Sequence, residues 1–321
     1  MGLICKYQAF FCSFAKIMEI KTTTSPTVRN RKKAIVFMLM ASLSFAFMGA
    51  FAKELGHKFN SVEIVFFRNF FGSVVLLTAI FFRPLQNKGS NLNLLIFRGL
   101  IGTFGLYCFS YTLTHMTMGE AFTYFQTSSF FIAFLSYFFL KETLNKWGWL
   151  AIFIGFVGIV VCFRPDIEFL KFSNLLGIMN GLFSALAYMS VSALNQLYDR
   201  RAIVLSFMLS GTVVSALSMT IGYYYPIPSL SAIVAAPIMP NWSDAFYILG
   251  IGSFAVLGQY FVTIAYSNEK SGIVSVVSYS NIIFSIALGV MLHDPWPDFM
   301  SILGIVLIII SGSIIAFVKD I

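Results

Sequence analysis

Apolar runs of about 20 residues recur along nearly the whole chain, and they constrain the fold more than any other feature. An α-helix needs about 20 apolar residues to cross the hydrocarbon of a bilayer, and a helix satisfies its backbone hydrogen bonds within one segment. We therefore predict an all-α membrane protein. Its ten transmembrane helices are expected at about 34–52, 62–83, 94–115, 119–140, 145–163, 174–196, 202–225, 244–267, 272–292 and 299–318.

The basic residues between these runs predict which side of the membrane each loop faces. With the N-terminus inside, the inner segments carry twelve basic residues and the outer loops carry four, which are Lys53, Lys58, Arg164 and Lys171. Lys and Arg are enriched in cytoplasmic loops. We therefore expect a multi-pass protein of the bacterial inner (plasma) membrane with both termini cytoplasmic. These clusters account for the net charge of +8, so we expect no nucleic-acid partner.

Residues 1–33 are expected to form a cytoplasmic N-terminal segment. This stretch is weakly apolar, but Lys6, Gln8 and Lys16 interrupt it, so it is too short and too polar to cross the membrane. Two alternatives stay open. The segment lies on the cytoplasmic membrane surface, or translation begins at Met18 and the first 17 residues are a start-site artefact, which we favour slightly.

The two halves of the chain resemble each other at an offset of 153 residues. Gly99 matches Gly252, Gly105 matches Gly258 and Tyr107 matches Tyr260, and the register continues through the helices that follow. Five helices are an odd number, so the second half must insert upside down relative to the first. An inverted repeat is typical of secondary transporters, which bind substrate between the halves. The alternative is a duplicated scaffold with no role in transport.

Three segments resemble the drug/metabolite transporter superfamily, specifically its proteins with two tandem EamA domains. They are FFRNFFGSVVLL (66–77), FRGLIGTFGLYCFSYTL (97–113) and the long stretch from Gly119 to Val161 with its Leu140–Glu142 turn. The resemblance implies a first EamA repeat at 34–163 and a second at 174–318. It also implies a central cavity lined by the first, third, fourth, sixth, eighth and ninth helices. The second half departs from the pattern, because its turn reads Leu292, His293, Asp294.

Polar residues inside the predicted helices are the candidate substrate-binding residues, because polar groups in hydrocarbon are costly unless they face protein or a cavity. Arg68 could hold a carboxylate or phosphate; its alternatives are snorkelling to the headgroups or pairing with Glu63 or Glu120. Arg98 lies one turn from the inner surface, where we expect it to snorkel or pack against another helix. The full candidate set is Arg68, Tyr107, Gln126, Ser128, Asn180, Gln259, Tyr260, Tyr279 and Asn281.

Gln126 and Ser128 in the fourth helix correspond, under the repeat, to Tyr279 and Asn281 in the ninth. Two symmetric polar layers at mid-depth are what a central site would need. Interhelical hydrogen bonding is the competing use of such residues. For the other candidates, packing or hydrogen bonding is the alternative to ligand contact.

The sequence gives no sign of catalysis. The histidines lie at helix ends, no Asp or Glu lies at mid-membrane, the cysteines lack metal-ligand spacing, and there is no phosphate loop. We expect no enzyme activity, cofactor or metal. The expected function is transport of a small polar metabolite, amino acid-like or S-adenosylmethionine-like, by alternating access. The alternative is a flippase for a lipid-linked substrate. The expected partners are this substrate and membrane lipids, and monomer and dimer both stay open.

Overall fold

The computed structural model describes residues 30–86, 89, 91–135, 145–163, 172–225, 234, 236–296 and 298–317. Of the predicted N-terminal segment 1–33, residues 1–29 lie outside the described residues. The Leu140–Glu142 turn also lies outside them. The helices are α2 (Arg31–Leu55), α3 (Ser61–Phe82), α4 (Leu92–His115), α5 (Met118–Leu135), α6 (Lys146–Phe163), α7 (Phe172–Leu194), α8 (Arg200–Tyr224), η3 (Trp242–Asp244), α9 (Ala245–Asn268), α10 (Ser271–Val277), α11 (Ser280–Met291) and α12 (Phe299–Phe317).

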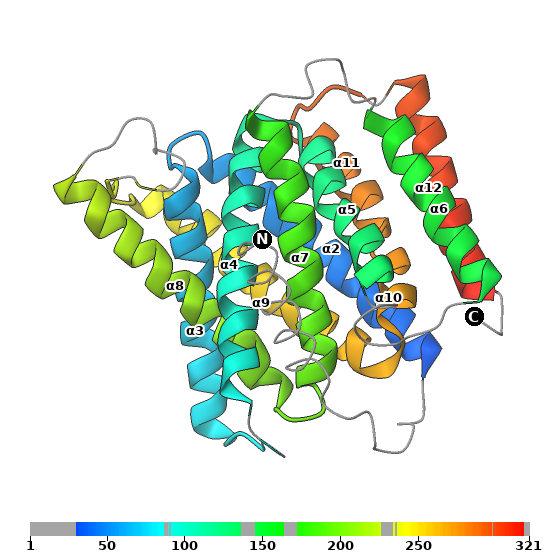
Figure 1. The fold of residues 1–321 in the computed structure, drawn as a ribbon. Helices are drawn as coiled ribbons and strands as arrows, with labels where there is room; N and C mark the ends of the chain where they lie inside the picture. The colour runs from blue at the N-terminus through cyan, green and yellow to red at the C-terminus, as the bar shows by residue number, and fades with distance from the viewer. Residues whose placement is uncertain are drawn as a thin grey trace, which may run out of the picture.

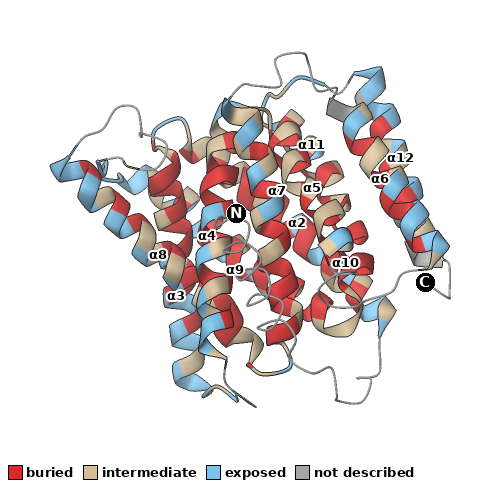
Figure 2. Cartoon of the chain, viewed as in Figure 1, coloured by how far each residue is buried: buried red, intermediate tan, exposed pale blue. Residues whose placement is uncertain are grey.

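Seven helical segments of the described residues are long and apolar enough to cross a membrane. They are α2, α3, α4, α7, α8, the segment Trp242–Asn268 and the segment Ser271–Met291, and shorter apolar helices occupy Lys146–Val161 and Ile302–Ser311. The outer faces expose large apolar side chains such as Val74, Phe153 and Leu217 (Figure 2). So much exposed apolar surface is suited to lipid and not to water. The chain is therefore a multi-pass membrane protein, as the sequence predicts.

Polar residues at the helix starts explain where several helices begin. The Asn60 side chain accepts hydrogen bonds from the backbone N–H groups of Val62 and Glu63, and the Glu63 carboxylate accepts one from the N–H of Asn60. Asn91 caps α4 and Asp199 caps α8 in a similar way. These contacts satisfy N–H groups that the helix itself leaves without acceptors.

The helices pack in matched couples (Figure 1). The pairs α2–α9 and α4–α7 are among the largest contacts, and the pairs α2–α11 and α5–α7 also pack together, as do α3–α9 and α4–α8. The pair α3–α8 lies on one flank and the pair α6–α12 on the other. The middle of the bundle therefore lies between α2, α4, α5, α7 and α9.

The ninth predicted span, 272–292, is broken in two. α10 ends at Val277 and α11 starts at Ser280. The hydroxyls of Ser275 and Ser278 donate to the carbonyl oxygens of Gly272 and Ser275 at 2.9 and 2.6 Å. Such contacts compete with the helix ladder and bend helices. The break turns the side chain of Tyr279 toward α6, where a Cβ at Gly155 would lie 2.2 Å from the ring.

Candidate functional site

A cavity lies in the middle of the bundle, between helices from both halves of the chain. Its open space for the centre of a water molecule is about 50 Å³. A cavity of this size holds a few waters but no metabolite, so the surrounding helices would have to move apart before a metabolite could fit. The lining residues are Phe45, Met48, Arg68, Arg98, Gly102, Leu106, Phe109, Phe122, Phe125, Asn180, Ser184, Ala187, Tyr188, Phe207 and Gln259.

These residues come from α2, α3, α4, α5, α7, α8 and α9. The family resemblance implies a smaller set of helices, and here α3 and α8 join it through Arg68 and Phe207. The ninth predicted helix, by contrast, contributes none of these lining residues. Its α10 segment packs against α5 instead, through the serine contacts described below.

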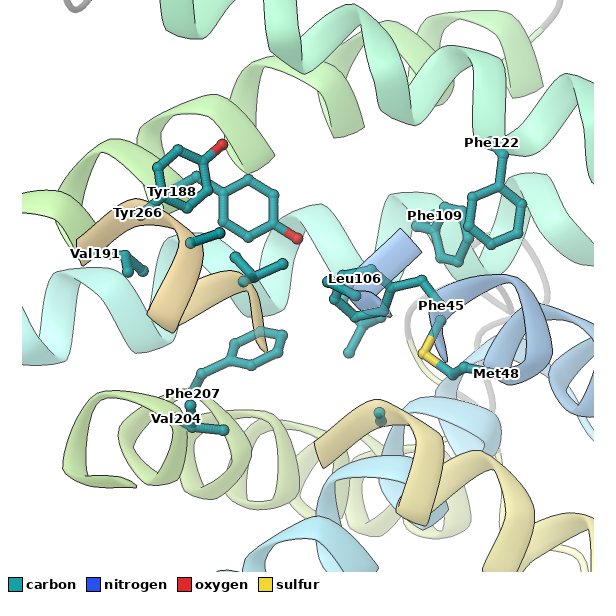
Figure 3. Close-up of a cluster of buried hydrophobic side chains, with 14 of the residues drawn as sticks. Phe45, Met48, Leu106, Phe109, Phe122, Tyr188, Val191, Val204, Phe207 and Tyr266 are labelled. Atoms are coloured by element: carbon teal, nitrogen blue, oxygen red, sulfur yellow. The ribbon is translucent and has the colours of Figure 1, made fainter. Parts of the chain in front are cut away.

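Six of the fifteen lining residues are aromatic, and Figure 3 draws several of them among the neighbouring buried side chains. The rings of Phe109 and Phe122 are 5.0 Å apart in an edge-to-face arrangement. The rings of Tyr188 and Tyr266 stack at 5.6 Å. Figure 3 shows these two pairs as separate groups, with Phe207 near the tyrosines. The wall thus offers apolar surface and ring faces that attract cations.

Arg68 lies in this wall with 3% of its surface exposed. Its Nε donates to the sulfur of Met48 at 3.1 Å and its Nη1 donates to Oδ1 of Asn69 at 3.2 Å. Its Cζ lies 5.2 Å from the centre of the Phe207 ring. Neither alternative that the sequence leaves open is observed, because Arg68 does not reach the surface and has no carboxylate partner among the described residues.

Glu63 and Glu120, the acids considered as partners of Arg68, have other hydrogen-bond partners. Glu63 accepts from the backbone N–H groups of Asn60 and Ile238. Glu120 accepts from the N–H and hydroxyl of Thr117. Both acids thus accept hydrogen bonds at the starts of their own helices, and Glu63 also binds the backbone of the segment before η3.

Arg98 also faces the cavity, so of its two expected roles snorkelling is wrong, and contact with another helix is observed. It is 2% exposed, its Nη2 donates to Oε1 of Gln259 at 3.1 Å, and its Cζ lies 4.6 Å from the centre of the Phe207 ring. Gly102, one turn further along α4, makes room for it, since a Cβ there would lie 2.4 Å from Nη1 of Arg98. The side chain points inward and occupies the space beside Gly102, so the guanidinium stays inside the bundle.

The cavity therefore holds two guanidinium groups and, among its described lining residues, no carboxylate. Three ion pairs among the described residues lie at the ends of helices, between Lys53 and Asp294, Lys58 and Asp244, and Arg201 and Asp199. The Cζ atoms of Arg68 and Arg98 lie 5.2 and 4.6 Å from the centre of the same ring, that of Phe207. They are therefore less than about 10 Å apart, and two unit charges at that distance repel by about 2 kcal/mol at an effective dielectric constant of about 20. A bound anion would relieve this repulsion.

Buried hydrogen-bond donors without acceptors also favour an anion in this cavity. In the described part of the chain, Nε of Arg98 and Nδ2 of Asn180 are buried and have no partner. Both residues line the cavity. Buried polar groups are nearly always paired, so the site lacks acceptors that a ligand could supply.

Three of the nine candidate residues from the sequence, Arg68, Asn180 and Gln259, come together in this cavity. Tyr107 lies elsewhere, where its hydroxyl forms a hydrogen bond with Oγ of Ser215 on α8 at 3.0 Å. Tyr260 lines a separate surface pocket that also contains Arg83 and Asp199. There, burial would raise the pKa of Asp199, but hydrogen bonds and charge from Arg201 hold this pKa below its usual value.

The two polar layers predicted in the fourth and ninth helices lie outside the set of cavity-lining residues. Nε2 of Gln126 donates to Oγ of Ser278 at 2.8 Å, and the hydroxyl of Ser129 donates to the carbonyl of Ser275 at 2.8 Å. Ser128 and Tyr279 are buried beside these contacts, 2% and 1% exposed. Asn281 is 1% exposed, and neither amide atom of its side chain has a partner within the described chain. The hydrogen bond of Gln126 Nε2 links α5 to the segment just after α10, while its Oε1 is buried without a partner in the described structure.

Tyr188 and Phe207 are cavity residues that the sequence analysis missed. Tyr188 follows Asn180 and Ser184 at four-residue spacing on α7, so all three share one helix face, and this pattern could have identified it. Phe207 is one of 37 phenylalanines, and no pattern around it sets it apart.

Known transporters resemble this chain. Residues 32–164 match the model of the EamA-like transporter family. An uncharacterized transporter of Helicobacter pylori is 32% identical over 286 residues, which cover 88% of this chain and 94% of that protein. A solved crystal structure has a TM-score of 0.71 at 16% identity, covering 91% of this chain and 98% of the other. At that identity the likeness concerns the fold alone.

Two further relatives have named substrates. The pseudopaline exporter CntI of Pseudomonas aeruginosa is 26% identical and covers 87% of this chain and 94% of its own length. The S-adenosylmethionine uptake transporter of Rickettsia felis is 25% identical and covers 86% of this chain and 89% of its own length. The names of these relatives are those of transporters and not of enzymes. The chain belongs to the EamA-like transporter family of the drug/metabolite transporter superfamily.

Proposed function

We propose that the chain carries a small polar metabolite across the membrane by alternating access, and that this metabolite carries a carboxylate. The observation that supports this most is the pair of buried guanidinium groups, Arg68 and Arg98, in a central cavity without an acid among its described lining residues. Arg binds carboxylates strongly through charge-assisted hydrogen bonds. Amino acid-like and S-adenosylmethionine-like compounds both contain such a group.

The matched helix couples support an inverted repeat with halves at 34–163 and 174–318. If α2 to α6 correspond to α7, α8, α9, α10 with α11, and α12, exchanging the halves turns the pair α2–α9 into α7–α4. The same exchange turns α5–α7 into α11–α2 and α4–α8 into α9–α3. Two such halves can exchange conformations and so open the cavity to either side in turn.

The relatives favour a soluble small molecule as substrate but leave the direction of transport open. One relative is named an exporter and another an uptake transporter. By the distribution of basic residues, the turn between α2 and α3 faces outward and both termini face the cytoplasm. Direction would then follow from the gradient or coupling and not from the fold.

Ion pairs are suited to closing the outer end of the cavity. Lys53 at the end of α2 pairs with Asp294, which also accepts a hydrogen bond from the backbone N–H of Met118 at 3.1 Å. Lys53 and Asp294 are 17% and 14% exposed, so solvent screens the pair only partly. It joins α2, the start of α5 and the end of α11.

Asp294→Asn is expected to open this end more often, because the amide keeps an acceptor for Met118 but loses the ion pair. Losing about 1 kcal/mol of closing energy shifts the population about fivefold. The measurement is the labelling rate of a Phe122→Cys reporter by a membrane-impermeant thiol reagent, with the native cysteines replaced by serine. Glu54→Gln, which removes a nearby negative charge outside this pair, is the matched control. Equal rates in both variants would contradict the gate.

The proposed function is tested by ligand stabilisation of the full chain in detergent. A compound that binds only the folded state raises the melting temperature. We expect a soluble carboxylate-bearing metabolite to raise it, and Asn180→Ala in the cavity to reduce this rise several-fold. Leu217→Ala on the exposed face of α8 should leave it unchanged. Stabilisation by lipid-linked compounds alone would favour the flippase and reject this proposal.

A further inference from the structure

We infer that the substrate carries two anionic groups, one for Arg68 and one for Arg98, so that the carrier selects dianions over monoanions and zwitterions. This inference rests on the proposed function, because it assigns a substrate class to the same cavity. It goes beyond a single carboxylate and follows from the geometry of the two guanidinium groups.

The two guanidinium groups belong to one site and yet have separate partners. Both lie within 6 Å of the centre of the Phe207 ring, one from α3 and one from α4. The distance between the two Cζ atoms therefore cannot exceed the sum of their distances from the ring centre, which are 5.2 and 4.6 Å. A small linear molecule with an acid group at each end can reach both.

Each guanidinium group has donors left for an anion. Nε of Arg98 is buried without a partner in the described structure. Nε of Arg68 donates to the thioether of Met48, and sulfur of this kind is a weak acceptor. A carboxylate oxygen would be a far better acceptor at either position.

Charge balance favours two anionic groups over one. A monoanion would neutralise one guanidinium and leave the other buried without a counter-charge, which is costly in a low-dielectric site. A zwitterion would add an ammonium group, and the described lining residues include no acid to receive it. The ring face of Tyr188 and the side-chain oxygens of neutral residues such as Ser184 could attract that group, but they supply no counter-charge. A dianion leaves the site neutral.

The apolar wall restricts where the acid groups can lie. Ring faces carry partial negative charge, so anionic groups should bind to the guanidinium groups and not to Phe109 or Phe122. The hydrocarbon chain between the acid groups would then pack on these rings. The expected class is a short dicarboxylate, or an acid with one carboxylate and one phosphate group.

The test compares dianions with half esters of the same length. The melting temperature of the full chain in detergent is measured against succinate, glutarate and adipate, against their monomethyl esters, and against 3-phosphoglycerate, at neutral pH and constant ionic strength. We expect a dianion to bind about tenfold or more tightly than its half ester. Stabilisation by a dicarboxylate or by 3-phosphoglycerate distinguishes a substrate with two carboxylates from one with a carboxylate and a phosphate group.

Two variants locate the preference. Arg68→Gln and Arg98→Gln should each reduce the preference for the dianion over the half ester to about twofold or less. Lys146→Gln, which removes an exposed positive charge at the start of α6, should keep the full preference. If either cavity variant fails to fold, the comparison of dianion and half ester on the wild-type chain still decides.

The outcomes separate this inference from the proposed function. Equal binding of a dianion and its half ester, both weakened by Asn180→Ala, would overturn the two-anion site and leave a carrier of monocarboxylates. Stabilisation by S-adenosylmethionine or a zwitterionic amino acid, with none by the dianions, would overturn it in the same way. Stabilisation by lipid-linked compounds alone would overturn both.

Discussion

Arg68→Met is expected to reduce transport about a hundredfold while leaving the substrate-free protein at least as stable as the wild type. Removing one partner of a buried charged contact typically costs about 2–5 kcal/mol of binding. Met fills a similar volume and removes a buried charge that repels Arg98. The relief of about 2 kcal/mol should offset the loss of the hydrogen bond to Asn69, worth about 1 kcal/mol.

This combination separates a substrate-binding arginine from a structural one. The measurements are uptake into proteoliposomes and the melting temperature in detergent without ligand. Gln126→Ala is the comparison, because Gln126 bonds Ser278 across the α5–α10 interface, and its removal should lower the melting temperature of the ligand-free protein. A large drop in stability for Arg68→Met would mean that the arginine holds the bundle together, and would count against its role in binding.

The sequence predicts the helices better than it predicts the site. Helix positions follow from apolar length and from cap residues such as Asn60 and Asp199, which are local properties. Arg68, Asn180 and Gln259 could be identified because each is a polar residue in an apolar run. Their selection needed only the depth of each residue in its helix.

The site features that the sequence does not predict depend on contacts between helices. The depth of Arg98 in its helix favours snorkelling, but Gly102 makes space for the guanidinium and Gln259 accepts its hydrogen bond. Gln126 sits at mid-depth as a site residue would, but its amide nitrogen donates to Ser278, which lies between α10 and α11. A helical pattern indicates which residues share a face, and not which neighbouring helix covers that face.

The closed shape of the cavity links the fold to the mechanism. Six aromatic side chains and two guanidinium groups are among the residues that line it. The two guanidinium groups repel each other in this small cavity, so a bound anion would stabilise the packed arrangement of the helices around it. A carrier needs this property in order to move its substrate only when it is loaded, because a ligand shifts a conformational equilibrium only through its different affinity for the two states.

Gly99→Ala is expected to lower the free energy of unfolding by about 2–3 kcal/mol, at the upper end of what overpacking costs. A Cβ at this position would lie 2.2 Å from Oγ of Ser210 and 2.8 Å from the carbonyl oxygen of Ser206, both on α8. The serine hydroxyl can move aside, but the carbonyl belongs to the helix backbone. The methyl group would therefore push α4 and α8 apart, and both helices line the cavity.

Gly105→Ala on the same helix is the matched control. There the nearest atom to the added Cβ is Cβ of Phe183 at 3.2 Å, and the next is Oγ of Ser184 at 3.4 Å, so a small shift suffices. Both variants gain the same helix propensity, about 1 kcal/mol, which cancels in the comparison. We expect unfolding in detergent to begin at a clearly lower temperature for Gly99→Ala. Equal stability of the two variants would mean that α4 and α8 are not held at this close distance in the membrane protein.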